Sequence, residues 1–163
     1  MTEFFEDDDY YTGPPLDPQR VHRAEASLGV RLPARYLEVL AERNGGVLRR
    51  GCFRTDFPTT WARDHFEVLA LLGLGGDWGI DSTSGLGSAD MVAEWGYPDI
   101  GVVICDTPSG GHDTVMLDYS DSGREGEPAV VYVDEDRIPR RVAGSFAEFL
   151  AGMVPCESLG DGT

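Results

Sequence analysis

Residues 95–119 read WGYPDIGVVICDTPSGGHDTVMLDY, and they contain two short apolar runs separated by turn-forming residues. The first run is VVIC at 102–105, the second is TVML at 114–117, and 106–113 lie between them. Such runs, bounded by Asp, Pro, Ser and Gly, predict a β-hairpin with a long loop. The first run is apolar on both faces, which predicts a central strand. The second alternates, with Val115 and Leu117 on one face and Thr114, Met116 and Asp118 on the other.

Two further strands are predicted on either side of this hairpin, from FEVLALL at 66–72 and AVVYV at 129–133. The segments 47–64, 73–87 and 120–128 carry loop-forming residues, and the second of them is rich in Gly, Ser and Asp. Loops as long as 73–87 often carry function.

Helices are predicted at both ends of the chain. Asp17 caps a first helix that Gly29 ends, with Pro18 at its first position. A second helix follows Leu32-Pro33 and stops at residues 44–46, Asn-Gly-Gly. Ser88 caps a short helix to Trp95, and Ser145 with Glu148 forms a capping box for the last helix.

This order of elements is two helices, then mostly strands with one short helix, then a closing helix. It predicts a single α+β domain with a largely antiparallel sheet flanked by helices. We expect residues 1–16 to be an acidic, aromatic N-terminal arm packed on the body. The domain proper spans 17–154, and 155–163 are expected to form a frayed tail.

The charge limits the classes of partner. The chain has 29 acidic and 13 basic residues, a net charge of −16 and an isoelectric point of about 4.3. Such a field repels phosphate backbones and anionic membranes, so neither is expected as a partner. It attracts a basic partner and speeds the encounter. The alternative is that acidity only keeps the protein soluble.

The cysteines and the apolar runs bear on the compartment. Cys52, Cys105 and Cys156 form no CxxC pair, and their odd number disfavours both a disulfide framework and a zinc knuckle. Cys105 is expected to pack as a small buried residue. No apolar run approaches the ~20 residues that span a bilayer, and the N-terminus lacks a signal core. We therefore expect a cytoplasmic protein.

Catalytic motifs are weak. His112-Asp113 resembles the metal-binding pair of HD phosphohydrolases, but a lone dipeptide equally serves to satisfy backbone groups in a turn. The glycines from Gly73 to Gly79 do not fit a GxGxxG frame, because Trp78 takes the third glycine position, and the loop has no Walker lysine. Serines 82, 84 and 88 have no GxSxG context. We predict no catalytic, cofactor or metal site and no enzyme activity.

Several ordered segments together resemble a known family. Residues 28–46 carry LG, LP, Tyr36 and NGG in order, and PTTW at 58–61 is followed by Asp64-His65. With the arm FFEDDDYYTGPPL, the stretch 95–133 and the closing helix, they resemble the bacterial branch of the SMI1/KNR4 family in the SUKH superfamily, over roughly residues 4–154. One departure is Phe5, where the family often has Trp.

The resemblance implies an α+β fold with a twisted sheet flanked by helices. It also implies a function, because bacterial SUKH proteins are mostly immunity proteins that bind and neutralise a cognate toxin domain, often a nuclease. We therefore expect a non-enzymatic immunity (antitoxin) protein with a basic toxin as partner. Two alternatives stay open: a regulatory interaction module like the eukaryotic relatives, and a small metal-dependent hydrolase that uses His112 and Asp113. The oligomeric state is also open.

Exposed aromatic residues among acids on loops are typical anchors of a binding surface. Trp78, in the glycine-rich loop, is our first choice. Trp95 and Tyr119 flank the hairpin, and their alternative role is packing in the core. The candidate partner-binding residues are Trp61, Asp64, Asp77, Trp78, Asp81, Glu94, Asp106, Asp113, Asp118 and Tyr119.

Overall fold

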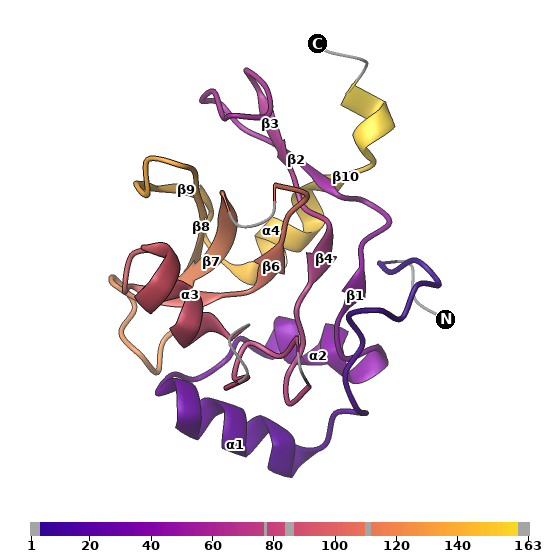
Figure 1. The fold of residues 1–163 in the computed structure, drawn as a ribbon, viewed down its shortest axis with the longest axis vertical. Helices are drawn as coiled ribbons and strands as arrows, with labels where there is room; N and C mark the ends of the chain where they lie inside the picture. The colour runs from indigo at the N-terminus through magenta and orange to yellow at the C-terminus, as the bar shows by residue number, and fades with distance from the viewer. Residues whose placement is uncertain (1–3, 77, 84–86, 110–111, 160–163) are drawn as a thin grey trace.

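The computed structural model describes residues 4–76, 78–83, 87–109 and 112–159 (Figure 1). Its helices are α1 (Pro18–Leu28), α2 (Ala34–Glu42), α3 (Ser88–Trp95) and α4 (Phe146–Gly152), with a short 3₁₀ helix η1 (Cys156–Leu159). The described residues form an α+β domain, as expected. No helix among them is long and apolar enough to cross a membrane.

The strands form three antiparallel sheets. The largest has the order β5-β7-β8-β9, from β5 (Gly101–Val103), β7 (Thr114–Asp118), β8 (Ala129–Val133) and β9 (Pro139–Ala143). A second has the order β1-β4-β6, from β1 (Gly46–Val47), β4 (Ala70–Leu71) and β6 (Cys105–Asp106). The third has the order β10-β2-β3, from β10 (Met153–Val154), β2 (Cys52–Arg54) and β3 (His65–Glu67).

The predicted hairpin is present, but its first strand is shared between two sheets. Val103 pairs with Met116 in the large sheet, whereas Cys105 pairs with Leu71 in the sheet of β4. Ile104 joins them, because its N–H donates to Val115 and its carbonyl accepts from Leu72. Every side chain from 102 to 105 is buried, as a central strand requires. On β7, Thr114 and Met116 are buried as well, so both faces of that strand are covered.

Other strand predictions need correction. The run 66–72 is divided into β3 and β4, which lie in different sheets, and the predicted loop 47–64 contains the end of β1 and all of β2. β8 has the predicted bounds. β9 was not predicted, since its residues at the edge of the sheet alternate between exposed and partly buried until Ala143.

The helix ends follow local rules, with one exception. The Asp17 carboxylate accepts from the Arg20 N–H, and Gly29 ends α1 in the left-handed conformation with φ 72°. The exception is Ser88, which was predicted to cap α3 but is the first residue of the helix. The N-cap residue is Gly87. The Ser88 hydroxyl instead accepts from Val103 N–H and joins α3 to β5.

The remaining two helices begin differently. Pro33 is the N-cap residue of α2, and no side chain caps this helix. The Glu25 carboxylate accepts from Leu32 N–H and so fixes the backbone just before the helix. At α4 the Ser145 hydroxyl accepts from Glu148 N–H, as a capping box predicts.

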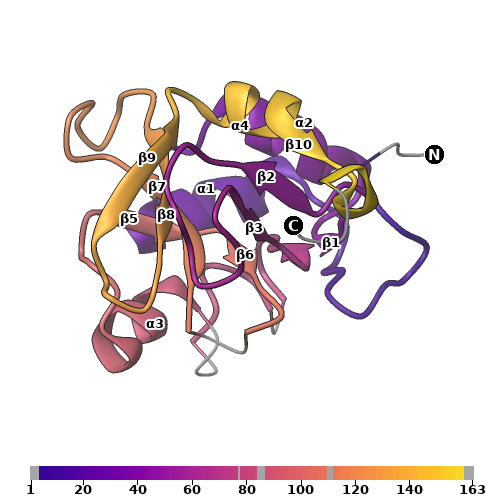
Figure 2. The same ribbon diagram turned by 90° about the horizontal axis from the view of Figure 1, so that it is seen from above.

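Stacked aromatic rings hold the sheets and helices together. Phe66 stacks on Tyr132 with ring centroids 4.2 Å apart, and Phe53 stacks on Phe66 at 5.6 Å. Phe149 of α4 continues the stack 5.2 Å from Phe53. Figure 2 shows α2 and α4 side by side, with α3 at the opposite edge of the molecule. The rings therefore join the two sheets of β2 and β8 to the closing helix.

The N-terminal segment contacts the body along its length. Phe5 is 1% exposed and forms an isolated antiparallel bridge with Leu48. The phenol ring of Tyr11 is also buried, whereas Tyr10 is 64% exposed. Arg43 at the end of α2 donates to the carbonyl oxygens of Glu6 and Asp8. The acidic residues from Glu6 to Asp9 are exposed at the surface.

The expectation about the cysteines was wrong in one respect. Cys52 and Cys156 form a disulfide bond, which joins β2 to η1 over a sequence separation of 104 residues. Residues 155–159 of the predicted frayed tail are therefore attached covalently to the body. An odd number of cysteines is compatible with one bond, because Cys105 is free and buried.

The disulfide predicts a redox-dependent stability. Opening the bond is expected to lower the free energy of unfolding by about 2–5 kcal/mol, because it closes a long loop in the unfolded chain. Urea denaturation with and without a reductant measures this difference. A Cys52→Ser/Cys156→Ser variant is the control, since its midpoint should not respond to reductant. An unchanged midpoint for the reduced wild-type protein would contradict the prediction.

Candidate partner-binding surface

The loop of the central hairpin is fixed by a buried carboxylate. Asp113 is 2% exposed, and one of its oxygens accepts from the Thr107 and Ser109 hydroxyls at 2.6 Å each. The other accepts from the indole N–H of Trp61 at 2.5 Å and from the Tyr132 hydroxyl. Burial and this hydrogen bond raise the pKa of Tyr132, so its hydroxyl stays a donor. Asp113 thus ties the hairpin loop, the 55–64 loop and β8 together.

A second buried carboxylate repeats this attachment. Asp134 follows β8 directly, and its oxygens accept from the backbone N–H and the hydroxyl of Thr60, both at 2.9 Å. Arg137 lies at the next turn and donates to the carbonyl oxygens of Trp95 and His112. Its guanidinium also lies 4.1 Å from the ring centroid of Tyr97. The loops at this end of the sheet are therefore attached to one another.

His112 and Asp113, the pair considered as metal ligands, lie in different surroundings. The His112 ring is exposed and lies 3.4 Å from Glu135, whereas the Asp113 carboxylate is buried with all its hydrogen bonds made inside. The two side chains thus contact different partners. The geometry fits the role of satisfying groups in the turn.

A second group contains Trp78, Asp106 and two residues of the N-terminal segment. The Tyr11 hydroxyl donates to the Asp106 carboxylate at 2.6 Å. The Trp78 ring lies 4.8 Å from the Tyr11 ring and 5.5 Å from the Tyr10 ring, between centroids. Burial, and then the Asp106 hydrogen bond, raise the pKa of Tyr11. We call Tyr10, Tyr11 and Trp78 the aromatic cluster.

The buried side chain of Asn44 positions the aromatic cluster. Its amide group donates to the carbonyls of Pro14 and Leu74, and its carbonyl accepts from Leu74 N–H at 2.8 Å. A Cβ atom at Gly73 would lie 2.5 Å from the Asn44 main-chain oxygen, so only glycine fits there. Asn44 thus joins the N-terminal segment to the glycine-rich loop. Sequence reasoning missed this role, since the residue was noted only as part of a helix stop and of the NGG motif.

The structure disperses the other predicted residues. Asp64 and Glu94 are exposed, and Asp64 pairs with His65 at 2.9 Å. Asp81 is partly exposed and accepts from Gly75 N–H. Asp118, at the far end of β7, accepts from Ser120, and Tyr119 is buried with its hydroxyl on the Arg31 carbonyl. Trp95, weighed as a core residue, is 38% exposed. Asp77 lies outside the described residues.

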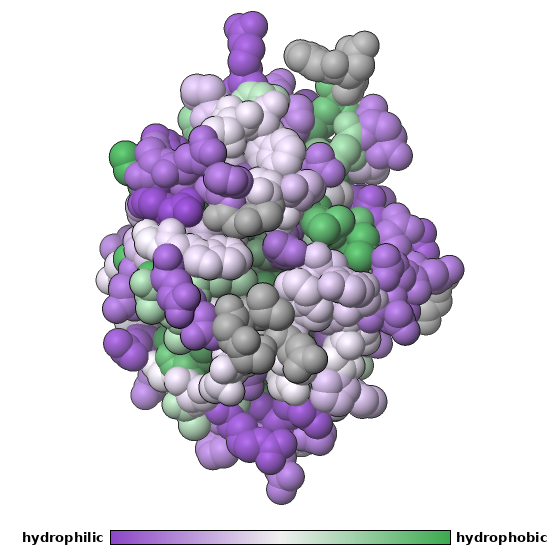
Figure 3. Space-filling model, viewed as in Figure 1, coloured by the Kyte–Doolittle hydropathy of each residue, from purple (hydrophilic) through white to green (hydrophobic). Residues whose placement is uncertain are grey.

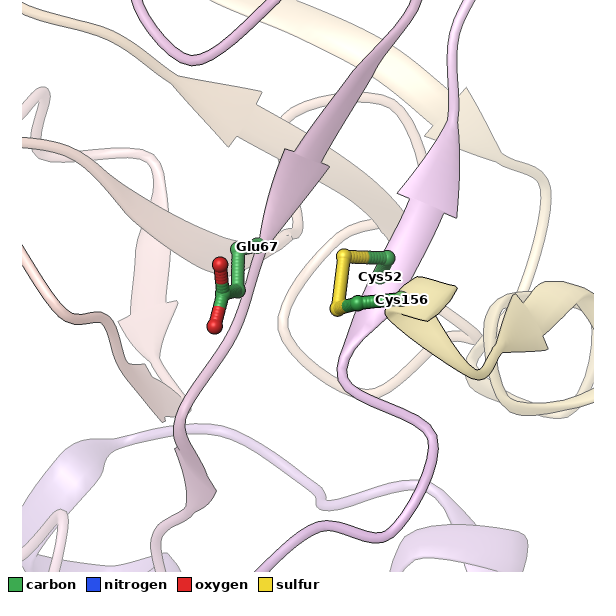
Figure 4. Close-up of side chains that lie close together, drawn as sticks. All are labelled: Cys52, Glu67 and Cys156. Atoms are coloured by element: carbon green, nitrogen blue, oxygen red, sulfur yellow. A yellow bond between two sulfur atoms is a disulfide. The ribbon is translucent and has the colours of Figure 1, made fainter. Parts of the chain in front are cut away.

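One group of possible metal ligands occurs among the described residues. Cys52, Glu67 and Cys156 have ligand atoms within 4.8 Å of one another (Figure 4). The two sulfur atoms are bonded to each other, however, and a thiolate is the form that binds a metal. With the disulfide closed, the group does not fit a metal centre.

Asp113 yields a prediction about stability. Asp113→Ala should lower the free energy of unfolding by about 2–4 kcal/mol, because four donors lose their buried acceptor. The matched control is Asp64→Ala, an exposed carboxylate in the loop that Asp113 holds, with an expected change of about 0.5 kcal/mol or less. Urea denaturation of both variants measures the effect. Equal midpoints for the two would show that Asp113 does not hold these loops.

Comparisons with known proteins agree with this fold. The model of the SMI1 / KNR4 family (SUKH-1) matches residues 15–152, which is most of the chain. The search of curated proteins returned no match. The matched region runs from the segment before α1 to the end of α4, so it includes all three sheets except for β10. The chain therefore belongs to the SMI1/KNR4 family (SUKH-1).

Proposed function

We propose that this chain is a non-enzymatic immunity protein that binds and neutralises a cognate bacterial toxin domain. The observation that carries the proposal is the family match over residues 15–152, because the SUKH family is known for immunity proteins. Inhibition by binding needs a rigid surface and no chemistry. The attachments of Asp113 and Asp134 supply such rigidity to the loops at one end of the sheet.

The charge supports a basic partner, of which a nuclease domain is an example. The chain carries a net charge of −16, and nuclease domains present basic surfaces to their substrates. An acidic protein can cover such a surface by electrostatic complementarity and can associate rapidly with it. In the view of Figure 3, hydrophilic residues dominate the lower end of the molecule, over α1, and the right-hand edge, near the N-terminal segment. The colour gives hydropathy and not the sign of charge, and α1 itself carries Arg20, Arg23 and Glu25.

Seven of the predicted partner-binding residues fit this role by their exposure. Asp113 and Tyr119 are buried, so we assign them to the scaffold. The side chains that are at least partly exposed, and that we propose as contacts, are Trp61, Asp64, Trp78, Asp81, Glu94, Asp106 and Asp118. We place the complex in the cytoplasm, where an immunity protein meets a toxin that has entered the cell.

The test uses the cognate toxin domain, which is sought first by a pull-down with the tagged protein from its own host. The purified protein should inhibit it at a one-to-one ratio, and the association rate should fall about tenfold or more from low to moderate salt, since steering is screened. Surface plasmon resonance and a toxin activity assay measure the two effects. A toxin domain of unrelated family serves as the control. Full toxin activity in an excess of this protein would refute the proposal and favour a regulatory interaction module.

A further inference from the structure

The aromatic cluster lines a surface cavity. The cavity has a volume of about 340 Å³, and its walls include the rings of Tyr10, Tyr11 and Trp78. The main chains of Gly13, Gly76 and Gly79 also line it. A Cβ atom at Gly79 would lie 2.7 Å from Gly75 N, and one at Gly13 would lie 3.1 Å from the Asn44 amide nitrogen, so these glycines let the walls pack closely. The cavity therefore offers aromatic rings beside a closely packed, glycine-rich wall.

The surroundings of the cavity are acidic. Asp106 accepts from Tyr11 behind the ring, and Asp8 accepts from the backbone N–H of Tyr10 at 2.9 Å. Asp81 holds the glycine-rich loop through Gly75. A hydroxyl that donates to a carboxylate makes its ring more electron-rich. Burial together with this hydrogen bond raises the pKa of Tyr11, so the phenol stays protonated.

No residue of the chain supplies a cation to this cavity from its described lining. That lining contains no Lys, Arg or His. Two arginines lie close to it: Arg43 donates to the carbonyls of Glu6 and Asp8, and the Arg20 side chain lies against Gly75 with a buried Nε for which the described residues supply no hydrogen-bond partner. The aromatic rings of Tyr10 and Trp78 thus belong to a lining that carries no cation of its own.

We propose that this cavity receives one basic side chain, Lys or Arg, from the partner protein. Aromatic faces attract cations, Trp most strongly, and the attraction grows when water is displaced. Arginine also stacks flat on aromatic rings. The inference rests on the proposed function for the identity of the partner, whereas the chemistry of the site is independent of it.

The first experiment needs no toxin. The chain has three tryptophans, so its NMR spectrum contains three indole N–H signals, which single Trp→Phe variants assign. N-acetyl-arginine amide should shift the Trp78 signal saturably, at least about threefold more tightly than the neutral N-acetyl-citrulline amide. Trp61 and Trp95 are internal controls in the same sample. Equal responses to the two amides, or equal shifts of all three signals, would overturn the proposal.

The second experiment uses the toxin complex. Tyr10→Ala should raise the dissociation constant about tenfold, because it removes one wall of the cavity. Tyr10 is 64% exposed, so the variant is expected to fold. Ile138→Ala, which removes an exposed apolar side chain just before β9, is the matched control and should leave affinity unchanged. A toxin that binds Tyr10→Ala as tightly as wild type would refute the cavity as a contact while leaving the immunity role intact. If the cavity bound the arginine amide but the protein bound no toxin, the immunity role would be refuted and the cation site would be kept.

Discussion

The carboxylate of Asp113 is the group on which the arrangement of this end of the molecule depends. A buried charge is costly unless its hydrogen bonds are complete, and here two hydroxyls, a phenol and an indole complete them. The four donors come from the hairpin loop, β8 and the 55–64 loop. All four donate to one carboxylate. If the loops moved independently of the sheet, this buried carboxylate would therefore lose hydrogen bonds, which is costly.

Local signals were enough to predict the helices and the hairpin. Asp17, Gly29 and Ser145 act on neighbouring residues through caps, so their effect is readable from the sequence. The division of the first hairpin strand at Ile104 was not readable, because a fully buried apolar run looks the same whether its partner strand changes or not. β9 was missed for the opposite reason. It is an edge strand that begins with Pro139 and carries arginines, which propensity disfavours.

The candidate surface was predictable only in parts. Trp78 and Asp106 were selected because aromatic and acidic residues on loops are typical of interfaces. Their meeting depends on Tyr11, which lies 95 residues before Asp106, and on the Asn44 amide that joins the N-terminal segment to the glycine-rich loop. No spacing rule connects such distant positions. For the same reason the Cys52–Cys156 bond was not foreseen, since pairing depends on the approach of β2 and η1 in space.

Charge and shape act on different parts of recognition. A net charge of −16 raises the rate of encounter with any basic protein, so by itself it does not select one toxin among many. Selection requires groups with fixed geometry. Tyr11 and Trp78 have such geometry, because Asp106 fixes the phenol and Asn44 fixes the loop next to the indole. Tyr10, by contrast, is largely exposed and can adjust to the partner. A site built in this way admits a basic side chain only at one position on the partner surface, and thereby turns a general attraction into a specific contact.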